Sequence, residues 1–571
     1  MRGTGGALLY ATLKSHGVTC LFGMEDPIHV FHAVDRSFTR IVTVRDEKHA
    51  AIMAHGYAQV TGRPGVCAAT FGPGATNLIT GLLEAQRSSV PVIALVQDHA
   101  LRLKNKHASS ALDHAVALAP YVKEVIRIDT PEQAGDAVRK AFRIATTGRA
   151  GPVVLLCPGD VMAAEAEAET WADQTYSHFP ANRVRASHDS IAGAARLLAS
   201  ARRPLLIAGG GTIISGAEEE VRLLAELFDM PVATTMTGRG AIPDAHPLAA
   251  GPLGSTTGGR YGRGRISNTL FAEADVVFVL GSRTGQLCYS DWTLPKAGTK
   301  LIHLDIDPAE IGRNFATDVA MVGDVRDTLR DLLAHCAELG LARTDATGRE
   351  RLDALTRDWR EEFHPVATSG QVPIRPERLL AEISARAGER TLIVTDASYV
   401  TGWAMSHIDV PTAGRFILSP RGTGGIGWSL PAAIGAKRLF PDRTVIAFAG
   451  DGCFLMNGQD FATAVQYELP VIVIVVDNGM YGTIRMHQEK HYPGRVSATT
   501  LKNPNFAAYA KAFGGHGERV ETTEEFAPAF ERAVASGKPA IIHCLLDPEA
   551  ITPAKSLSTI RAEAMEAQGK G

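Results

Sequence analysis

Cysteine is scarce in this sequence and forms no local pairs. The chain has 7 cysteines among 571 residues, and none of them belongs to a C-x-x-C pair, which excludes a disulfide scaffold and a cysteine-rich zinc site. Long apolar runs are missing as well: none approaches the roughly 18 residues of a membrane span, and the apolar stretch near the N-terminus is too short for a signal peptide. We therefore expect a cytoplasmic protein that does not bind membranes.

An excess of positive charge is also missing. Lys and Arg number 58 against 61 Asp and Glu, which gives a net charge of −3, so no basic surface is expected to gather nucleic acid. Aromatic residues make up only 6% of the chain, yet a hydrophobic fraction of 45% is enough for several packed cores and excludes a disordered chain. At about 150 residues per domain, the length predicts three to four domains.

What the sequence does contain is a series of short, wholly apolar runs. Each has the length of a strand, is rich in β-branched residues and does not alternate with polar residues, which is typical of parallel strands buried on both faces. Helical stretches lie between them, as at 218–228 and 459–467. The pattern predicts an α/β protein with parallel sheets. The expected strands include 90–96, 204–208, 276–280, 444–449 and 471–476.

The first and last thirds of the chain resemble each other. Both contain an apolar run that begins at a proline and ends at an aspartate with the same spacing, Pro91 to Asp98 and Pro470 to Asp477. The middle third has strand signals of its own and a glycine turn at Gly209–Gly211. We expect three doubly wound parallel-sheet domains. Their boundaries are predicted at residues 1–165, 186–340 and 372–550, followed by a tail at 551–571.

Two polar turns follow consecutive strands in the last domain. Gly450-Asp451-Gly452 ends one expected strand, and Asp477-Asn478-Gly479 ends the next. Because a right-handed crossover brings both turns to the carboxyl edge of the sheet, Asp451 and Asn478 are expected to converge. Their oxygens, with a nearby carbonyl, are hard ligands of the kind that Mg²⁺ prefers, and Gly452 allows a diphosphate to approach the backbone closely.

This pair of turns resembles the thiamine-diphosphate signature, in which a GDG triplet is followed by an Asn pair. Here Asp477 replaces the first Asn and Asn478 is retained. The resemblance extends over essentially the whole chain and is nearest to acetolactate synthase-type enzymes. It implies a site for thiamine diphosphate and Mg²⁺. The implied metal ligands are Asp451, Asn478 and the carbonyl of Met480, and further implied coenzyme contacts are Gly452, Cys453 and Tyr481.

The first domain supplies the other half of the site by the same resemblance. Glu47 stands where the family has the glutamate of its R-H-E-x-x-A-A motif, and Phe71–Asn77 resembles the G-P-G-x-x-N turn beside the aminopyrimidine. The implied roles are catalysis for Glu47, which hydrogen-bonds the pyrimidine N1′, and coenzyme contacts for Gly74 and Asn77. Family members join the two halves across a subunit interface, which implies a homodimer or homotetramer.

A glycine-rich loop in the last domain allows two interpretations. Gly422–Gly427 matches G-x-G-x-x-G after a strand-like segment, which is a weak indication of a nicotinamide-binding dehydrogenase. It is more similar to the family's G-x-G-x-x-G-x-x-L-P loop, because Leu430-Pro431 follows. The resemblance then places Gly424 against the coenzyme and Ile426 at the position of the apolar wedge that bends it. It also aligns Ser398 and Tyr399 with a diphosphate-contacting loop.

The middle domain and the substrate contacts are less well defined. The Gly209–Gly211 turn would suit FAD or ADP, which some relatives hold there, but Ser282–Leu287 replaces the R-F-D-D-R-type loop of flavin-binding synthases, and a domain without a ligand is an equal alternative. Three acetolactate synthase features are also altered, which indicates a changed acceptor pocket. A P-G-G turn is replaced by Met24–Pro27, an F-Q motif by Ser109-Ser110, and a tryptophan by His487.

The resemblance implies an enzyme that makes or breaks a carbon–carbon bond beside a carbonyl, with the coenzyme as electron sink. We expect decarboxylating carboligation of 2-oxo acids of the acetolactate synthase type. The alternatives are a lyase or decarboxylase of 2-hydroxyacyl-CoA or oxalyl-CoA, and an aromatic 2-oxo acid decarboxylase similar to benzoylformate decarboxylase, with the tail from Ile551 closing over the site. An inactive regulatory subunit is disfavoured because Glu47, Asp451 and Asn478 are all present.

Overall fold

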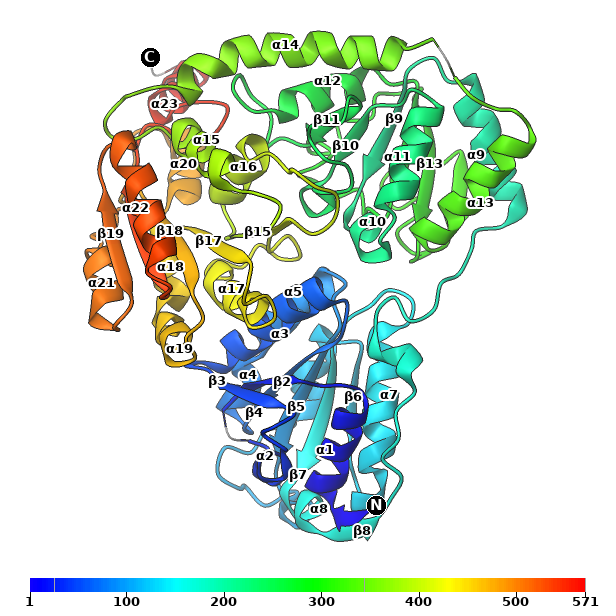
Figure 1. The fold of residues 1–571 in the computed structure, drawn as a ribbon, viewed down its shortest axis with the longest axis vertical. Coiled ribbons are helices and arrows are strands. Elements are labelled where there is room, and N and C mark those ends of the chain that lie inside the picture. Colours follow the sequence, from blue (N-terminus) through cyan, green and yellow to red (C-terminus); the bar gives the residue numbers. More distant parts are fainter. Residues whose placement is uncertain (25, 344, 570–571) are drawn as a thin grey trace. The chain divides into compact units, whose positions relative to one another are not determined.

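A computed structural model describes residues 1–24, 26–343 and 345–569 of the chain. Three six-stranded sheets form its framework, one in each third of the sequence (Figure 1). Strands within these sheets run parallel, which confirms the expected α/β fold class. Glu25, in the altered Met24–Pro27 turn, and the last two residues of the tail lie outside the described residues.

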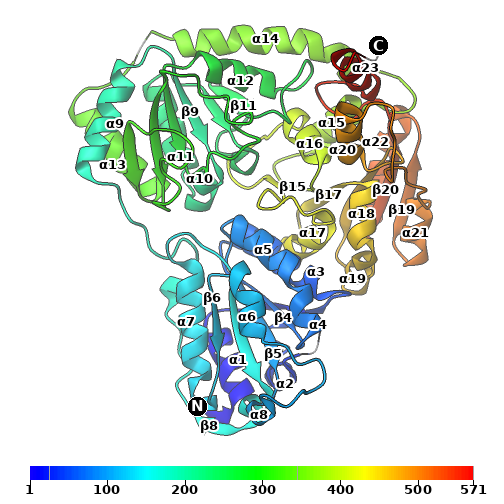
Figure 2. The same cartoon turned by 180° about the vertical axis from the view of Figure 1, so that it is seen from behind.

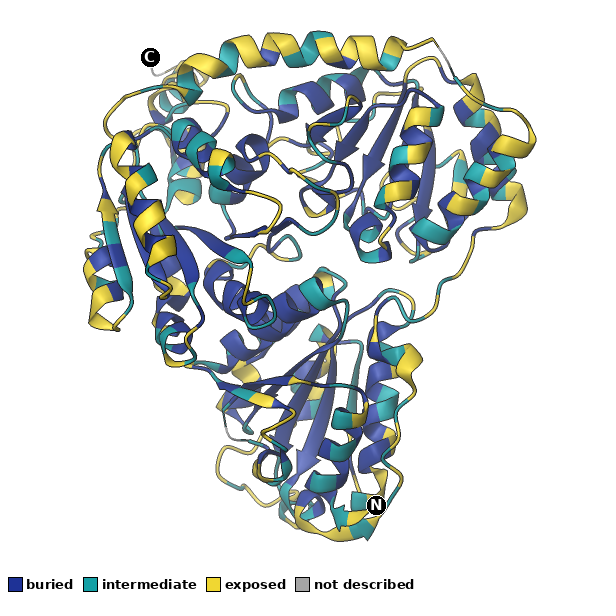
Figure 3. Cartoon of the chain, viewed as in Figure 1, coloured by how far each residue is buried: buried dark blue, intermediate teal, exposed yellow. Residues whose placement is uncertain are grey.

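The chain separates into two compact units. The first contains residues 1–182, 420–445 and 455–471. The second contains residues 183–419, 446–454 and 472–571, and therefore holds both the middle and the C-terminal sheet. In all three sheets the central strands are buried, while the outward faces of the covering helices are exposed (Figure 3).

The sheet of the first unit has the strand order β3-β2-β4-β5-β7-β6. Apolar side chains of three helices and of the central strands form one core beneath it. The helices are α1 (Gly5–Ser15), α2 (Ile28–Ala33) and α7 (Ala134–Thr146). The strands are β2 (Cys20–Gly23), β3 (Arg40–Thr43), β4 (Gly65–Ala69), β5 (Val92–Asp98), β6 (Glu124–Arg127) and β7 (Val153–Pro158).

A helix rich in small residues occupies the middle of the first unit. This helix, α3 (Glu47–Thr61), contacts β4, α5 (Ile79–Arg87) and α17 (Ser429–Lys437). A Cβ on Gly56 would lie 2.5 Å from the carbonyl oxygen of Ala432, so glycine is what permits the close approach of α3 and α17. Trp428, just before α17, is buried, and its ring meets that of His55 edge-on with 5.4 Å between centroids.

The middle sheet has the order β11-β10-β9-β12-β13-β14, in which the strand order reverses between β9 and β12 as in doubly wound folds. Helices α9 (His188–Ser200), α11 (Glu218–Leu227) and α13 (Val325–Glu338) pack on one face, and α12 (Gly264–Glu273) and α14 (Thr347–Ala367) on the other (Figures 1 and 2). Its strands are β9 (Pro204–Ala208), β10 (Val232–Thr234), β11 (Ala249–Pro252), β12 (Val276–Leu280), β13 (Lys300–Asp305) and β14 (Val319–Val322).

The C-terminal sheet has the order β16-β15-β17-β18-β20-β19, which repeats the sequential pattern of the first sheet. The similarity between the first and last thirds of the sequence therefore extends to their topology. Helices α15 (Pro376–Arg386), α16 (Tyr399–His407) and α22 (Thr523–Ala535) cover one face. The strands are β15 (Thr391–Thr395), β16 (Ile417–Leu418), β17 (Thr444–Gly450), β18 (Val471–Asp477), β19 (His516–Val520) and β20 (Ala540–Leu545).

The predicted elements match the observed ones with small shifts. The run expected at 90–96 forms β5 two residues later, which places Asp98 at the end of the strand. The helix expected at 459–467 is a 3₁₀ turn, Gly458–Asp460, followed by α19 (Phe461–Gln466). The break has a physical cause: the buried carboxylate of Asp460 accepts hydrogen bonds from the Arg45 amide and the Thr463 hydroxyl.

The C-terminal tail ends in a helix that packs within the second unit. This helix, α23 (Leu557–Ala567), lies on α20 (Gly482–His491). Arg561 donates two hydrogen bonds to the buried Glu489, at 2.7 and 2.8 Å. Ile551 and Leu557 pack with Met486. Among residues 1–24, 26–343 and 345–569, no helix combines the length and the apolar character of a membrane span.

Candidate functional site

Asp451 follows β17 at the carboxyl edge of the C-terminal sheet and begins α18 (Asp451–Asn457). Its side chain is buried, and one carboxylate oxygen accepts the Gly452 amide at 2.8 Å. The other oxygen accepts the Gly479 amide at 3.1 Å and the side-chain amide of Asn503 at 2.7 Å. The turns after β17 and β18 thus meet.

A second carboxylate, Asp477, shares this edge. The Asn503 amide bridges the two acids, because it also lies 2.8 Å from Asp477 Oδ1, and His543 Nε2 lies 2.9 Å from Asp477 Oδ2. Burial raises the pKa of Asp451 to about 7, and the charge of Asp477 adds to the rise. Burial also acts to raise the pKa of Asp477, but hydrogen bonds from His543 and Asn503 outweigh it and hold that pKa below its usual range. Asp451 is therefore the member of the pair that takes up a proton first as the pH falls.

The loop after β18 brings the other expected metal ligands to the same edge. Asn478 directs its side-chain amide toward Gly482, and Met480 pairs with Thr500 in an isolated bridge. Hydrogen bonds from Tyr481 to Thr499 at 2.9 Å and from Leu501 to Gly479 at 2.8 Å hold this loop. A Cβ on Gly452 would lie 2.6 Å from the Tyr481 ring, so the tyrosine occupies the space that glycine leaves open.

The loop after β15 approaches the same place. Ser398 has a positive φ of 72°, an unusual backbone conformation for serine, and its hydroxyl is hydrogen-bonded to that of Thr483. The thiol of Cys453 points to the Ala397 carbonyl at 3.9 Å. Tyr399 and Met480 each pack against the small apolar cluster that contains Met486. The Ser398 loop, the Asp451 turn and the Asn478 loop are therefore one cluster within the second unit.

The first unit brings together Glu47, Gly74 and Asn77. Glu47 is 6% exposed at the first turn of α3, and the Asn77 side-chain amide donates to its Oε2 at 3.0 Å. A Cβ on Gly74 would lie 3.0 Å from Glu47 Oε1. The Gly72–Asn77 turn, in which α4 (Pro73–Asn77) lies, therefore packs closely against this carboxylate. The glutamate and the turn expected beside the pyrimidine thus share one site.

The Gly422–Gly427 loop also belongs to the first unit. The buried carboxylate of Glu84, on α5, accepts the Gly422 and Thr423 amides, each at 2.7 Å, and the Thr423 hydroxyl at 2.6 Å. Gly424 has a φ of 73°, and the Ile426 side chain is 39% exposed. An exposed apolar residue on a firmly held loop is suited to pressing against a ligand.

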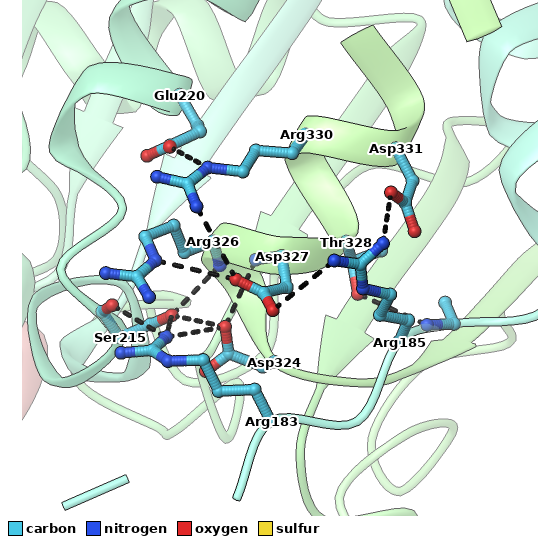
Figure 4. A network of polar contacts seen from close by, with 11 residues as sticks. Arg183, Arg185, Ser215, Glu220, Asp324, Arg326, Asp327, Thr328, Arg330 and Asp331 are labelled. Atoms are coloured by element: carbon cyan, nitrogen blue, oxygen red, sulfur yellow. Dashed lines mark hydrogen bonds and ion pairs between the residues drawn. The ribbon is translucent and has the colours of Figure 1, made fainter. Parts of the chain in front are cut away.

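The glycine turn of the middle domain is filled by the protein itself. A Cβ on Gly209 would lie 2.2 Å from the Gly281 carbonyl, and one on Gly210 would lie 2.9 Å from the Thr237 hydroxyl. Acidic groups at this sheet are paired: Asp324, after β14, binds Arg183 at 2.7 Å and Ser215 at 2.9 Å within a wider ionic network (Figure 4). These contacts assign no ligand to the middle domain, and a site for FAD or ADP stays a prediction.

Several residues of these clusters were not identified from the sequence. Asn503 and His543 reach the Asp451–Asp477 pair from distant segments, and Thr483 and Glu84 hold the Ser398 and Gly422 loops. Only His543 had a usable signal, because a histidine within an apolar strand must be satisfied by a polar neighbour. The sheet order that supplies the neighbour is not contained in the local pattern.

Comparison with protein families assigns all three thirds of the chain. Residues 3–118 match the N-terminal TPP binding domain of thiamine pyrophosphate enzymes, residues 191–332 their central domain, and residues 396–544 their C-terminal TPP binding domain. The chain belongs to the thiamine pyrophosphate enzyme family.

Within this family, the chain is similar to acetolactate synthases over nearly its full length. The chain is 35% identical to the probable acetolactate synthase large subunit of Methanocaldococcus jannaschii, over 96% of this chain and 93% of the relative. It is 33% identical to the acetolactate synthase large subunit of Parasynechococcus marenigrum, over 94% and 87%, and 32% identical to the acetolactate synthase of Mycobacterium bovis, over 99% and 92%. The expected resemblance to acetolactate synthase-type enzymes is confirmed.

Proposed function

We propose that the chain is a thiamine diphosphate- and Mg²⁺-dependent carboligase of the acetolactate synthase type. It decarboxylates one 2-oxo acid and joins the remainder to a second carbonyl compound. The observation that carries the proposal is the buried Asp451 carboxyl, which meets the Asn478 loop with no Lys, Arg or His paired to it among the described residues. The near full-length similarity to acetolactate synthase large subunits supports the substrate class.

The donor set suits a magnesium ion. Asp451, the Asn478 side-chain oxygen and the Met480 carbonyl are hard oxygen ligands, and the remaining positions of the ion are those that a diphosphate fills. Asp451 would hold the ion in its ionised form, and the charge of the ion would offset the repulsion between the Asp451 and Asp477 carboxylates. Gly452, Cys453, Tyr481, Ser398 and Tyr399 are the proposed neighbours of the diphosphate.

Glu47 is the proposed catalytic residue. Bound thiamine diphosphate supplies an acidic C2–H and an electron sink for the carbon–carbon bond change. Because Asn77 occupies Glu47 Oε2, Oε1 is the oxygen that holds or releases a proton toward the pyrimidine N1′. Gly74, Asn77, Gly424 and the exposed Ile426 side chain form the surface that positions the coenzyme.

The assembly is proposed from the family resemblance. Glu47 belongs to the first unit and Asp451 to the second, and we propose that they combine across the interface of a homodimer or homotetramer. The three domains are proposed at 1–165, 186–340 and 372–550, with the 551–571 tail beside the metal loop, and the protein is proposed to act in the cytoplasm.

A second candidate differs in the acceptor. Ser110 abuts the turn beside Glu47, since a Cβ on Gly72 would lie 2.8 Å from Ser110 Cβ. Acetolactate synthases have the F-Q motif at Ser109-Ser110, so the chemistry of this wall is changed. The observation favours a larger or more polar partner, as in a 2-hydroxyacyl-CoA lyase or an aromatic 2-oxo acid decarboxylase.

Product analysis separates these candidates. The purified protein is incubated with Mg²⁺, thiamine diphosphate and pyruvate alone, then with a panel of 2-oxo acids and acyl-CoA compounds, and products are identified by mass spectrometry. Acetolactate from pyruvate alone supports the first proposal. Decarboxylated or CoA-containing products without acetolactate support the second candidate and refute the first.

Substitution of Glu47 tests the catalytic assignment. Glu47→Gln retains the size of the side chain but cannot exchange a proton, so turnover should fall by roughly 10²-fold or more while coenzyme binding, measured by calorimetry, stays within a few-fold. Asp46→Asn, which changes the neighbouring carboxylate that caps α3, is the matched control. Equal turnover in Glu47→Gln and wild type would refute the role.

A further inference from the structure

A buried histidine is hydrogen-bonded to the turn beside Glu47. The Gly72 amide donates to His114 Nε2 at 2.8 Å, and His114 Nδ1 lies 2.9 Å from Asp98 Oδ1. The His114 side chain is fully buried and begins α6 (His114–Leu118), whereas Asp98 ends β5. Because β4 and β5 are parallel neighbours, their carboxyl ends place Gly72 and Asp98 side by side.

These contacts fix the protonation of the ring. A backbone amide can only donate, so His114 Nε2 must be the bare, accepting nitrogen, and the ring proton is on Nδ1, from which it is donated to Asp98. Asp98 Oδ1 also accepts the His99 amide at 2.8 Å. Burial acts to raise the pKa of Asp98, but the hydrogen bonds from His114 and His99 prevail and lower it, so Asp98 is a carboxylate at neutral pH.

Two hydrogen bonds join Asp98 to the Gly72 amide, and the Gly72–Asn77 turn continues from there to Glu47. Gly72 has φ 62° and ψ −118°, a conformation open essentially to glycine, and it begins the turn that ends at Asn77. Gly74 lies against Glu47 Oε1 and Asn77 donates to Oε2. A shift at the Gly72 amide is therefore transmitted to both groups that contact the Glu47 carboxylate.

We propose that Asp98 and His114 are positioning residues, which hold the Gly72–Asn77 turn so that Glu47 is oriented toward the coenzyme pyrimidine. This inference rests on the proposed thiamine-diphosphate chemistry. Asp98 sets the tautomer of His114, His114 fixes the Gly72 amide, and neither residue contacts the reacting atoms.

Two substitutions of His114 separate its two hydrogen bonds. The amide oxygen of His114→Gln reaches about as far as Nε2 and can accept from Gly72, whereas the side-chain amide of His114→Asn lies about where Nδ1 does, so it retains Asp98 and loses Gly72. Asp113→Ala removes the cap of the same helix, whose carboxylate accepts the Val116 amide at 3.1 Å, and serves as the control.

The readouts are deuterium uptake of the 70–78 segment in protein without coenzyme, and hydrogen–deuterium exchange at C2 of bound thiamine diphosphate by quenched-flow NMR. His114→Asn should increase the uptake and slow C2 exchange by roughly tenfold or more, because small misplacements of a catalytic group are costly. His114→Gln and Asp113→Ala should remain near the wild type in deuterium uptake and in C2 exchange. The unfolding temperatures of all three variants should stay within a few degrees of the wild-type value.

Unchanged C2 exchange in His114→Asn would overturn the inference, as would equal impairment of His114→Asn and His114→Gln, which signifies only a packing role. A wild-type protein with the expected exchange pattern but no acetolactate product would refute the proposed substrate and leave the positioning role intact. Failure to bind thiamine diphosphate would overturn both.

Discussion

The carboxyl edges of the middle and C-terminal sheets contain similar residues but differ in whether their acidic side chains are paired with cations. Each is a six-stranded sheet of parallel strands with glycine turns and aspartates after its strands. At the middle sheet Asp324 is neutralised by Arg183, and Glu220 by Arg330 at 2.7 Å (Figure 4). At the C-terminal sheet Asp451 faces a second acid, and no Lys, Arg or His of the described chain is paired with it.

This difference in charge pairing is the reason why we propose the metal site at the C-terminal edge and not at the middle one. A glycine-and-aspartate motif closes a tight turn at the edge of both sheets. A carboxylate that is already paired with arginine is a poor cation ligand, whereas a buried carboxylate without such a partner is a good candidate. The middle-domain acids have arginine partners, whereas burial without such a partner raises the pKa of Asp451. The contrast can be tested by changing one carboxylate at a time.

The largest effect on turnover is expected for Asp451→Asn. The amide cannot supply the negative charge that a divalent cation requires, so Mg²⁺-dependent coenzyme binding should weaken by about 10²-fold or more and turnover should become undetectable. Calorimetric titration with Mg²⁺ and thiamine diphosphate measures the loss. Because both carboxylate oxygens of Asp451 accept amides, the substitution turns a donor toward one of them, so the unfolding free energy should fall as well and turnover is measured on folded protein. Retained turnover would show that the edge is structural.

An intermediate effect is expected for Glu84→Gln. The Glu84 carboxylate is stabilised by hydrogen bonds from the Gly422 and Thr423 backbone amides. A glutamine side chain at this position accepts weaker hydrogen bonds and turns its NH₂ group toward one of these amides. We expect a loss of ~2 kcal/mol in unfolding free energy and a roughly tenfold lower kcat, because the Ile426 loop is less firmly held. Urea unfolding and steady-state kinetics measure the two, and Ser88→Ala, which removes only a hydroxyl contact to Glu84, is the control.

Asp324→Asn should alter stability with little effect on turnover. Its carboxylate is 4% exposed and pairs with Arg183, so removing the charge should cost about 3 kcal/mol of unfolding free energy. Activity per folded molecule should equal that of the wild type, measured at a temperature well below the unfolding transition. Loss of turnover in folded Asp324→Asn would mean that the middle edge serves the reaction after all.

The smallest effect is expected at acid pH. The hydrogen bonds from Arg561, together with that from Arg485, lower the pKa of Glu489 to about 2. A lowered carboxyl pKa stabilises the folded state above the ordinary value of 4.5, and that contribution is lost as the pH falls toward 2. Protection of the α23 amides, taken as the observed exchange rate relative to the intrinsic rate at each pH, should therefore fall between pH 4.5 and 2.5, whereas in Arg561→Gln it should already be lower at pH 7. Identical profiles would contradict the assignment.

Much of the fold and part of the site follow from local sequence. The strands predicted at 204–208 and 276–280 are observed with the same bounds, because each coincides with a short, wholly apolar run. The crossover rule suffices to bring Asp451 to the loop of Asn478. Asn503 and His543 could not be predicted, because their places depend on a loop path and on β20 lying between β18 and β19. The carboxylate of Glu84 has no local signal either, since its partners lie far along the chain.

The buried indole of Trp428, just before α17, should report on the neighbouring loop through its fluorescence. Trp428 follows directly on the Gly422–Gly427 loop, and its ring lies edge-on against His55 of α3. Because an indole in a dry, fixed environment emits at shorter wavelength than a hydrated one, seating or loosening of this loop should be visible as a shift in intrinsic fluorescence. The other four tryptophans can be replaced by phenylalanine to leave a single native emitter, which would follow coenzyme binding without a label or a product assay.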